Sequence, residues 1–67
     1  MLTAREEEML FAMADGLTNA EIAGELHIAK ATVKFHVDGV LRKLGARNRT
    51  HAVAIAYHRG ILVPLPS

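Results

Sequence analysis

The chain is 67 residues long and has no cysteine, and its 8 lysine and arginine residues nearly balance its 7 aspartate and glutamate residues. This length allows one domain at most, and the lack of cysteine excludes a disulfide framework and a thiolate metal site. No apolar run approaches the roughly 18 residues of a membrane-spanning helix, and residues 1–6 lack the features of a signal peptide. We therefore expect a single cytoplasmic domain over residues 1–67.

Charge is divided unevenly along the chain. Residues 1–29 contain six acidic side chains and one basic side chain, whereas residues 30–67 contain seven basic side chains and one acidic side chain. A polyanion such as DNA would be attracted to one part of such a molecule and repelled by the other. Two ordinary solvated surfaces would give the same pattern, so charge alone does not decide the partner.

The first predicted helix spans about residues 4–14. It begins with a capping box, in which the Thr3 hydroxyl and the Glu6 carboxylate each satisfy a free backbone amide at the helix N-terminus. Apolar residues at helical spacing predict one buried stripe, made of Met9, Leu10 and Met13. The acidic residues of the first turn are favoured there by the helix dipole, so they need no functional explanation.

The second predicted helix spans about residues 19–26 and begins with the same motif, Thr18 followed by Glu21. A helix of barely two turns is not stable alone in water, so this one must pack against longer neighbours. Residues 27–29 then form a tight connection, which forces the next helix to cross at a steep angle. A short helix, a tight turn and a longer helix together predict a helix-turn-helix.

The third predicted helix, about residues 30–44, has the clearest periodicity. Its inward positions are Val33, Val37, Val40, Leu41 and Leu44. The opposite face has a phenylalanine at its centre, Phe35, and a glycine in mid-helix, Gly39, and neither is typical of an ordinary solvated surface. Gly39 would allow a close approach to a DNA duplex, and Gly45 ends the helix as a left-handed cap.

The fourth predicted helix spans about residues 49–59, with Asn48 as its N-cap and Gly60 as its C-cap. Its middle is apolar nearly all round, which predicts that another molecule covers part of it. Residues 63–67 contain two prolines and are expected to be irregular. The predicted fold is therefore an all-α, compact four-helix bundle that contains a helix-turn-helix.

The third helix has the side chains that are needed to recognise bases. The major groove of B-DNA admits one α-helix, which presents side chains to the edges of the bases. Lys34 and Arg42 can donate hydrogen bonds to guanine, and Asp38 can accept one from cytosine. Ala31 and Phe35 can contact thymine methyl groups.

Other polar residues are candidates for contacts with DNA phosphates, which set the register of a complex rather than its sequence preference. They lie at helix starts, on the flanks of the third helix and in the basic loop. They are Thr18, Asn19, Lys30, Thr32, Lys43, Arg47, Arg49 and Thr50.

These residues resemble the LuxR/FixJ-type (GerE-like) DNA-binding domain of bacterial transcription regulators, over nearly the whole chain. The matching stretches are Leu2-Thr3-x-Arg5-Glu6-x-Glu8-x-Leu10, Gly16-Leu17-Thr18-Asn19-x-Glu21-Ile22-Ala23, Thr32-Val33-Lys34-x-His36-Val37, Lys43-Leu44-Gly45 and Arg49-x-x-Ala52-Val53. The resemblance implies that residues 30–44 enter the major groove and that an upstream receiver or ligand-sensing domain controls the effector. It also implies a homodimer on two half-sites, formed through residues 49–59.

Within residues 49–59, one helix face suggests the surface of such a dimer. The candidate interface residues are His51, Ala54, Ile55 and His58. Simple exposure to solvent is the alternative for this face.

Three positions depart from the family pattern. Where the family usually has serine or threonine as the cap before the recognition helix, this chain has Ala29, which costs about 1 kcal/mol. Asp38 and Gly39 stand where the family commonly has a basic or polar residue followed by asparagine, which predicts a different base preference. Glu7 stands where arginine is common.

Other classes of function have less support. The four histidines have neither an i, i+4 pair nor a cysteine partner, so we expect no metal and no cofactor. The chain has no serine before Ser67 and no carboxylate pair in an apolar setting, so we do not expect an enzyme. The competing class is a protein-interaction module that docks on RNA polymerase or another regulator through Phe35 or residues 49–59.

Overall fold

The computed structural model describes residues 1–63 and contains four helices over that range. They are α1 (Ala4–Ala14), α2 (Asn19–Leu26), α3 (Lys30–Leu44) and α4 (Arg49–His58). The all-α prediction is confirmed, and only the end of α4 differs, by one residue. Arg59 rather than Gly60 is the C-cap of α4, and Gly60 follows it with a left-handed φ of 74°. The predicted irregular tail is described only at Val63, which lies outside any helix, and its other residues fall outside the described range.

Local hydrogen bonds explain where the helices begin. Both capping boxes are present: the Thr3 hydroxyl accepts from the Glu6 amide at 3.1 Å, and the Thr18 hydroxyl accepts from the Glu21 amide at 3.2 Å. Asn48 Oδ1 accepts from a backbone amide of α4 at 2.8 Å, as expected for its N-cap. Ala29 precedes α3 in an extended conformation and has no side-chain cap, which confirms the predicted loss.

The turn between α2 and α3 is closed by His27, which has φ 56° and ψ 44°. It is the one non-glycine residue with a positive φ among residues 1–63. The left-handed region is disfavoured for residues with a Cβ, so the sequence had not indicated this conformation. The backbone amide of His27 donates to the carbonyl of Ala23, as does that of Ile28, so the end of α2 is capped despite the absence of glycine.

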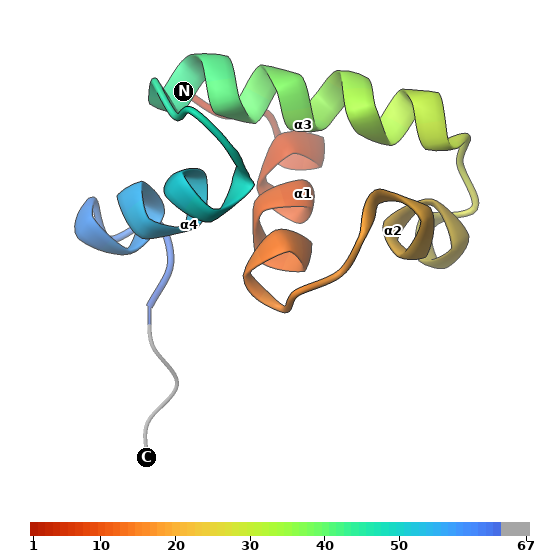
Figure 1. The fold of residues 1–67 in the computed structure, drawn as a ribbon, viewed down its shortest axis with the longest axis horizontal. Helices are drawn as coiled ribbons and strands as arrows, with labels where there is room; N and C mark the ends of the chain where they lie inside the picture. Colours follow the sequence, from red (N-terminus) through yellow and green to blue (C-terminus); the bar gives the residue numbers. More distant parts are fainter. Residues whose placement is uncertain (64–67) are drawn as a thin grey trace.

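The longest helix, α3, lies along one side of the molecule, and the other three helices lie on the same side of it (Figure 1). α1, α2 and α4 each contact α3, and α1 also contacts α4. α2 is seen nearly end-on beneath the first half of α3, in agreement with the steep crossing expected after a tight turn (Figure 1). One long face of α3 is therefore left without a helical neighbour.

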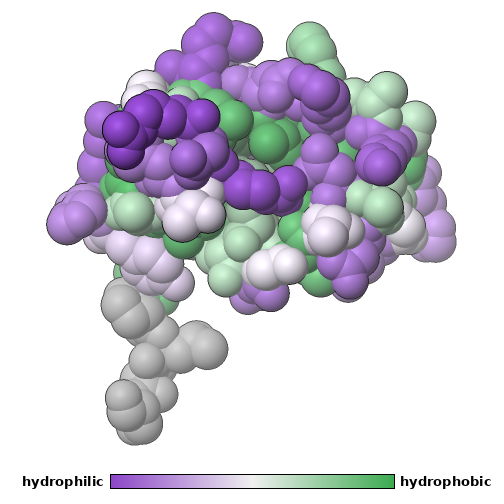
Figure 2. All heavy atoms as spheres, viewed as in Figure 1, coloured by the Kyte–Doolittle hydropathy of each residue, from purple (hydrophilic) through white to green (hydrophobic). Residues whose placement is uncertain are grey.

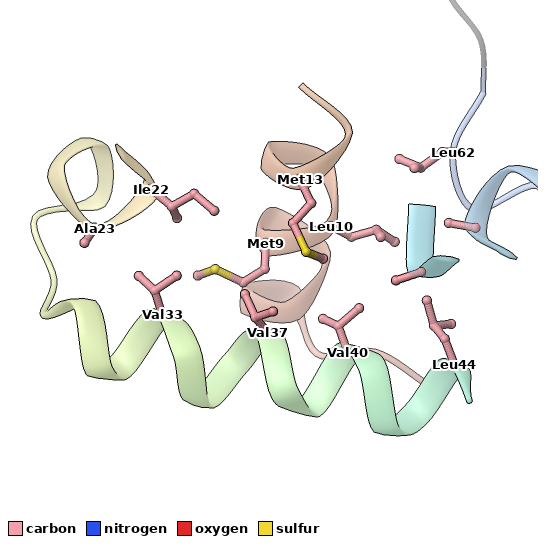
Figure 3. Packing of buried hydrophobic residues seen from close by; sticks show 12 residues of the cluster. Met9, Leu10, Met13, Ile22, Ala23, Val33, Val37, Val40, Leu44 and Leu62 are labelled. Carbon is pink, nitrogen blue, oxygen red and sulfur yellow. The ribbon is translucent and has the colours of Figure 1, made fainter. Parts of the chain in front are cut away.

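The hydrophobic core lies between α3 and the three other helices. The side chains of Val33, Val37, Val40 and Leu44 point from α3 toward Met9, Leu10 and Met13 of α1 and toward Ile22 and Ala23 of α2 (Figure 3). Leu62 closes the core beyond α4. The predicted inward stripes of α1 and α3 are thus confirmed, except that Leu41 is only partly buried at the edge. Within residues 1–63, no helix is long and apolar enough to cross a membrane.

Candidate nucleic-acid interface

The outer face of α3 is open to solvent. All five predicted base-contacting residues on it are exposed, namely Ala31, Lys34, Phe35, Asp38 and Arg42. Phe35 is 73% exposed, which confirms that this ring lies outside the core. Hydrophilic side chains gather along the edge of the molecule over α3, with separate hydrophobic groups among them (Figure 2). The face therefore combines hydrogen-bonding groups with apolar groups, as recognition of base edges requires.

Two of these residues are paired with each other one helical turn apart. Lys34 Nζ donates to Asp38 Oδ2 at 2.8 Å, and both side chains are mostly exposed. An exposed i, i+4 pair contributes only about 0.3–0.5 kcal/mol, so a bound duplex can replace it at little cost. The pair places the lysine ammonium beside an acceptor, and the two groups offer a donor and an acceptor at neighbouring points of α3.

The Phe35 ring has one aromatic neighbour, His36, at a centroid distance of 5.5 Å and an interplanar angle of 72°. This is an edge-to-face arrangement, which favours a defined orientation of the phenylalanine ring. His36 itself is half-buried. Phe35 is thus held at the surface rather than folded against the core.

Gly39 does not serve the role that the sequence suggested for it. It is buried, and a Cβ at this position would overlap the carboxylate of Glu6 in α1. The prediction that Gly39 lets a duplex approach α3 is therefore wrong. A larger residue here would displace the Glu6 carboxylate, so the close neighbour of Gly39 is a side chain of α1.

Lys43 makes an internal contact. Its Nζ donates to Glu6 Oε1 at 2.7 Å, and the same carboxylate oxygen accepts from the Thr3 amide at 2.8 Å. The hydrogen bond from Lys43 and then that from Thr3 lower the pKa of Glu6 to about 2. Lys43 thus holds α1 against α3, and its predicted phosphate contact would have to compete with a buried carboxylate.

Arg49 also has internal partners. Its guanidinium donates to Asn19 Oδ1 and to the carbonyl of Leu17, each at 3.0 Å. These bonds join the start of α4 to the start of α2, and Arg49, Leu17, Thr18 and Thr50 line a hollow between the two helix starts. The arrangement brings together four of the predicted phosphate-contacting residues, Thr18, Asn19, Arg49 and Thr50. It also shows that Arg49 and Asn19 brace the fold, a role that the sequence pattern had not revealed.

The remaining phosphate candidates lie at the surface. Lys30, Thr32 and Arg47 are exposed, and neither Lys30 nor Arg47 forms an ion pair with any described residue. They flank the outer face of α3, at its start and in the loop that follows it. Both cations are therefore available to an anionic partner, as are Arg42 and Arg59, which are also exposed and form no ion pair among residues 1–63.

The predicted dimer surface on α4 is only partly exposed. Ala54 and His58 are exposed, whereas Ile55 and His51 are half-buried. His51 Nδ1 accepts from the Arg47 amide at 3.0 Å, so this histidine also orders the basic loop. Tyr57, which is 42% exposed, adds an aromatic group to α4 that the sequence interpretation had not singled out. Among residues 1–63, no three histidine or acidic side chains are grouped in a way that could hold a metal ion.

Comparison with known proteins agrees with this geometry. The family model described as bacterial regulatory proteins, luxR family, matches residues 1–56. The response regulator protein VraR of Staphylococcus aureus is 45% identical over 62 residues, and its counterparts in Staphylococcus saprophyticus and Staphylococcus epidermidis are equally similar. The match covers 92% of this chain, and the chain spans about 30% of the length of these relatives. A crystal structure of the response regulator ChrA of a heme-sensing two-component system superposes with a TM-score of 0.88 at 40% identity, over 92% of this chain and 31% of that one.

Proposed function

Because the chain belongs to the luxR family of bacterial regulatory proteins, we propose that it is a sequence-specific DNA-binding effector domain of a transcription regulator. The relatives are named response regulators, which supports an effector role under the control of a sensing domain. The domain comprises residues 1–67 and acts in the bacterial cytoplasm, where its DNA is. Its function is binding rather than catalysis.

The observation that carries this proposal is the free outer face of α3. Three helices pack against the opposite side of α3, while Phe35 and Lys34 are exposed on its outer face. Such a helix fits the major groove, with Ala31, Lys34, Phe35, Asp38 and Arg42 directed at base edges. Lys30, Thr32, Arg47 and Thr50 then contact phosphates on either side.

The acidic part of the chain supports the same orientation. All but one of the acidic residues precede α3, whereas all but one of the basic residues lie in α3 or beyond it. Phosphates therefore attract the molecule through α3 and the loop after it, and they repel the side formed by α1 and α2.

A selection of binding sites from random duplex DNA tests the proposal directly, since it reports both the class of partner and the base preference. On the selected duplex, Lys34→Ala and Phe35→Ala should each reduce discrimination against other sequences by about 5–150-fold, as expected for a lost base contact of 1–3 kcal/mol. Arg47→Ala is the matched control. It should weaken binding to all duplexes about equally and reduce the slope of log affinity against log salt by about 1.

The outcome that contradicts the proposal is equally defined. Binding without preference among duplexes, or a site preference that neither Lys34→Ala nor Phe35→Ala alters, would remove α3 from the role of recognition helix.

The exposed ring of Phe35 favours a second candidate function, in which this face of α3 docks on another protein. Apolar docking depends weakly on salt, whereas binding through several phosphates weakens steeply as salt rises, so a salt titration distinguishes the two.

A further inference from the structure

A second surface, on the side of α1 and α2, has features that DNA binding does not explain. A groove of about 270 Å³ lies between the C-terminal half of α1 and α2. Ile22, which is fully buried, is at its base, and the apolar side chains of Phe11, Ala12, Leu17 and Leu26 line it. Phe11 is 51% exposed, so a large part of an aromatic ring faces solvent at this groove. Exposed aromatic surface that lines a hollow is typical of a binding site.

The rim of the groove is acidic, formed by Glu8, Asp15 and Glu25. Asp15 is the C-cap of α1, and Glu25 lies in the last turn of α2. The C-terminus of a helix carries partial negative charge, so folding alone favours lysine or arginine there. Neither helix has a basic residue in its last turn, and among residues 1–63 neither Asp15 nor Glu25 forms an ion pair.

The negative potential at the groove is therefore largely uncompensated from within the described chain. Only Glu8 has a cationic neighbour, Arg5, at 3.3 Å across an exposed i, i+3 pair. Asp15 and Glu25 place carboxylates at the C-terminal ends of α1 and α2, where they oppose the helix dipoles at a cost to the folded state. A cation supplied by a partner would remove this cost.

The position of the groove decides which partners can reach it. The C-terminal end of α1 and α2 lie on the side of α3 away from its free outer face (Figure 1). A molecule bound along the outer face of α3 leaves the groove open, and the acidic rim repels phosphate. The volume is just below the roughly 300–1,000 Å³ of usual small-molecule sites, and it suits one or two apolar side chains.

We propose that this groove binds a segment of another protein that inserts an apolar side chain against Phe11 and Ile22. Lysine or arginine residues on either side of that apolar residue pair with Asp15 and Glu25. The surface is separate from Phe35 and from α4, and it is available whether or not α3 is occupied. Charge complementarity identifies the partner as a basic, amphipathic segment, since an acidic or neutral one gains nothing from the rim.

The test is a selection of random peptides of about 12 residues, displayed on phage, against the full chain without DNA. The expected consensus has an apolar residue flanked by lysine or arginine. The selected peptide, made synthetically with a fluorophore, should bind at least about tenfold more weakly to Phe11→Ala and to Glu25→Lys. Because the selection needs no DNA, its failure and a failure of the proposed DNA binding are separate results.

Two control variants share the chemistry of these changes but lie elsewhere. Phe35→Ala removes the exposed ring on the outer face of α3, and Glu7→Lys reverses an exposed acidic residue of α1 that does not line the groove. Both should bind the peptide as the unaltered chain does. Circular dichroism checks that each variant is folded, and Glu25→Lys, at an exposed position, keeps the test valid if Phe11→Ala is destabilised.

Several results would overturn the proposal. They are an absence of enriched peptides, a consensus without basic residues, and a peptide affinity that is insensitive to Phe11→Ala and Glu25→Lys. Self-association of the chain that Phe11→Ala abolishes, measured by sedimentation, would show that a second copy occupies the groove and would also refute a heterologous partner.

Discussion

Glu6 connects the first turn of α1 to the C-terminal half of α3 through one carboxylate. It accepts hydrogen bonds from Lys43 and Thr3, is almost completely buried, and lies directly against Gly39. The helix dipole accounts for an acidic residue in this turn but not for its burial. The structure therefore assigns Glu6 a tertiary role in addition to its capping role.

This arrangement predicts how stability depends on pH. The folded-state pKa of Glu6, about 2, lies below its ordinary value of 4.5, so the carboxylate adds stability above pH 4.5 that is lost as the pH falls toward 2. The pKa of Glu21 is also lowered, by its hydrogen bonds with Thr18, and acts in the same direction. Glu6→Gln should lower the free energy of unfolding at pH 7 by about 1–3 kcal/mol and flatten its dependence on pH between 4.5 and 2.

Urea denaturation at a series of pH values measures both effects of Glu6→Gln. Glu7→Gln, at the exposed neighbouring position, is the control and should lower the stability only by the smaller contribution of a charge near the helix N-terminus, about 0.3–1 kcal/mol. An unchanged pH profile in Glu6→Gln would show that the hydrogen bonds from Lys43 and Thr3 do not stabilise the Glu6 carboxylate in solution.

Substitution by alanine is expected to have opposite effects on stability at Gly39 and at Gly24. Both are helical, but a Cβ at Gly39 would overlap the Glu6 carboxylate, whereas a Cβ at Gly24 meets nothing within 4 Å. Gly24→Ala should raise the free energy of unfolding by about 0.5–1 kcal/mol, the usual gain for alanine in a helix. Gly39→Ala should lower it by about 1–3 kcal/mol, because Glu6 is held in place by hydrogen bonds and cannot turn aside freely.

Thermal unfolding of the two glycine variants gives the comparison directly. Equal stabilisation by Gly24→Ala and Gly39→Ala would mean that the Glu6 side chain moves at no cost, and the close approach of α1 to α3 would then have no energetic importance.

At the scale of elements, the turn between α2 and α3 determines how the outer face of α3 is presented. His27 closes this turn in a left-handed conformation, and Ala29 precedes α3 with φ −69° and ψ 145° but gives it no side-chain cap. The first turn of α3 therefore has free backbone amides and is expected to fray. Lys34 and Phe35 lie just beyond it, so order at the start of α3 bears on the proposed interface.

The conformation of Ala29 already suits an N-cap, which predicts that Ala29→Ser stabilises the chain. A serine hydroxyl there can accept from an amide in the first turn of α3, for a gain of about 1 kcal/mol in the free energy of unfolding. Ala31→Ser is the control, since it adds the same hydroxyl at an exposed position inside the helix and should be slightly destabilising. Chemical denaturation decides the matter: if the two variants are equally stable, the first turn of α3 does not need a cap.

At the scale of the whole molecule, the assembly on DNA depends on which surface of α4 stays available. We propose that Ala54, Ile55 and His58, together with His51, form the contact between two copies, which bind two half-sites about one helical turn of DNA apart. Ala54 and His58 are exposed, and Ile55 is half-buried. In this proposal two copies associate weakly on their own, and DNA strengthens the association by holding both copies on one duplex.

Charged substitutions in α4 test this interface. Ile55→Glu and Ala54→Glu should each abolish cooperative binding of two copies to a duplex with two half-sites, while binding to one half-site is retained. Because Ala54 is exposed, Ala54→Glu should fold even if the half-buried position makes Ile55→Glu unstable. Val63→Glu, at an exposed residue beyond α4, is the control. Sedimentation that shows the same two-copy complex for all variants would exclude α4 from the interface.

Local chemistry within the sequence was sufficient for the helices and for the exposed face of α3. Capping boxes, helical periodicity and terminal glycines act between residues three to eight positions apart, so they predict helix bounds to within one residue here. The same periodicity placed Phe35 opposite the valines of α3, and the structure confirms it.

The tertiary structure alone decided which charged residues remain free. Lys43 bonds to Glu6 across 37 positions in the sequence, and Arg49 reaches Asn19 and Leu17 across 30 and 32 positions. No local pattern marks these partners, because they meet only after the helices have packed. That packing gives three of the predicted phosphate-contacting residues, Lys43, Arg49 and Asn19, hydrogen-bond partners within the fold, and it places Gly39 against α1. The sequence by itself thus determined which face of α3 is exposed. Packing of the helices determined which basic residues of the chain have hydrogen-bond partners within the fold and which remain available to another molecule.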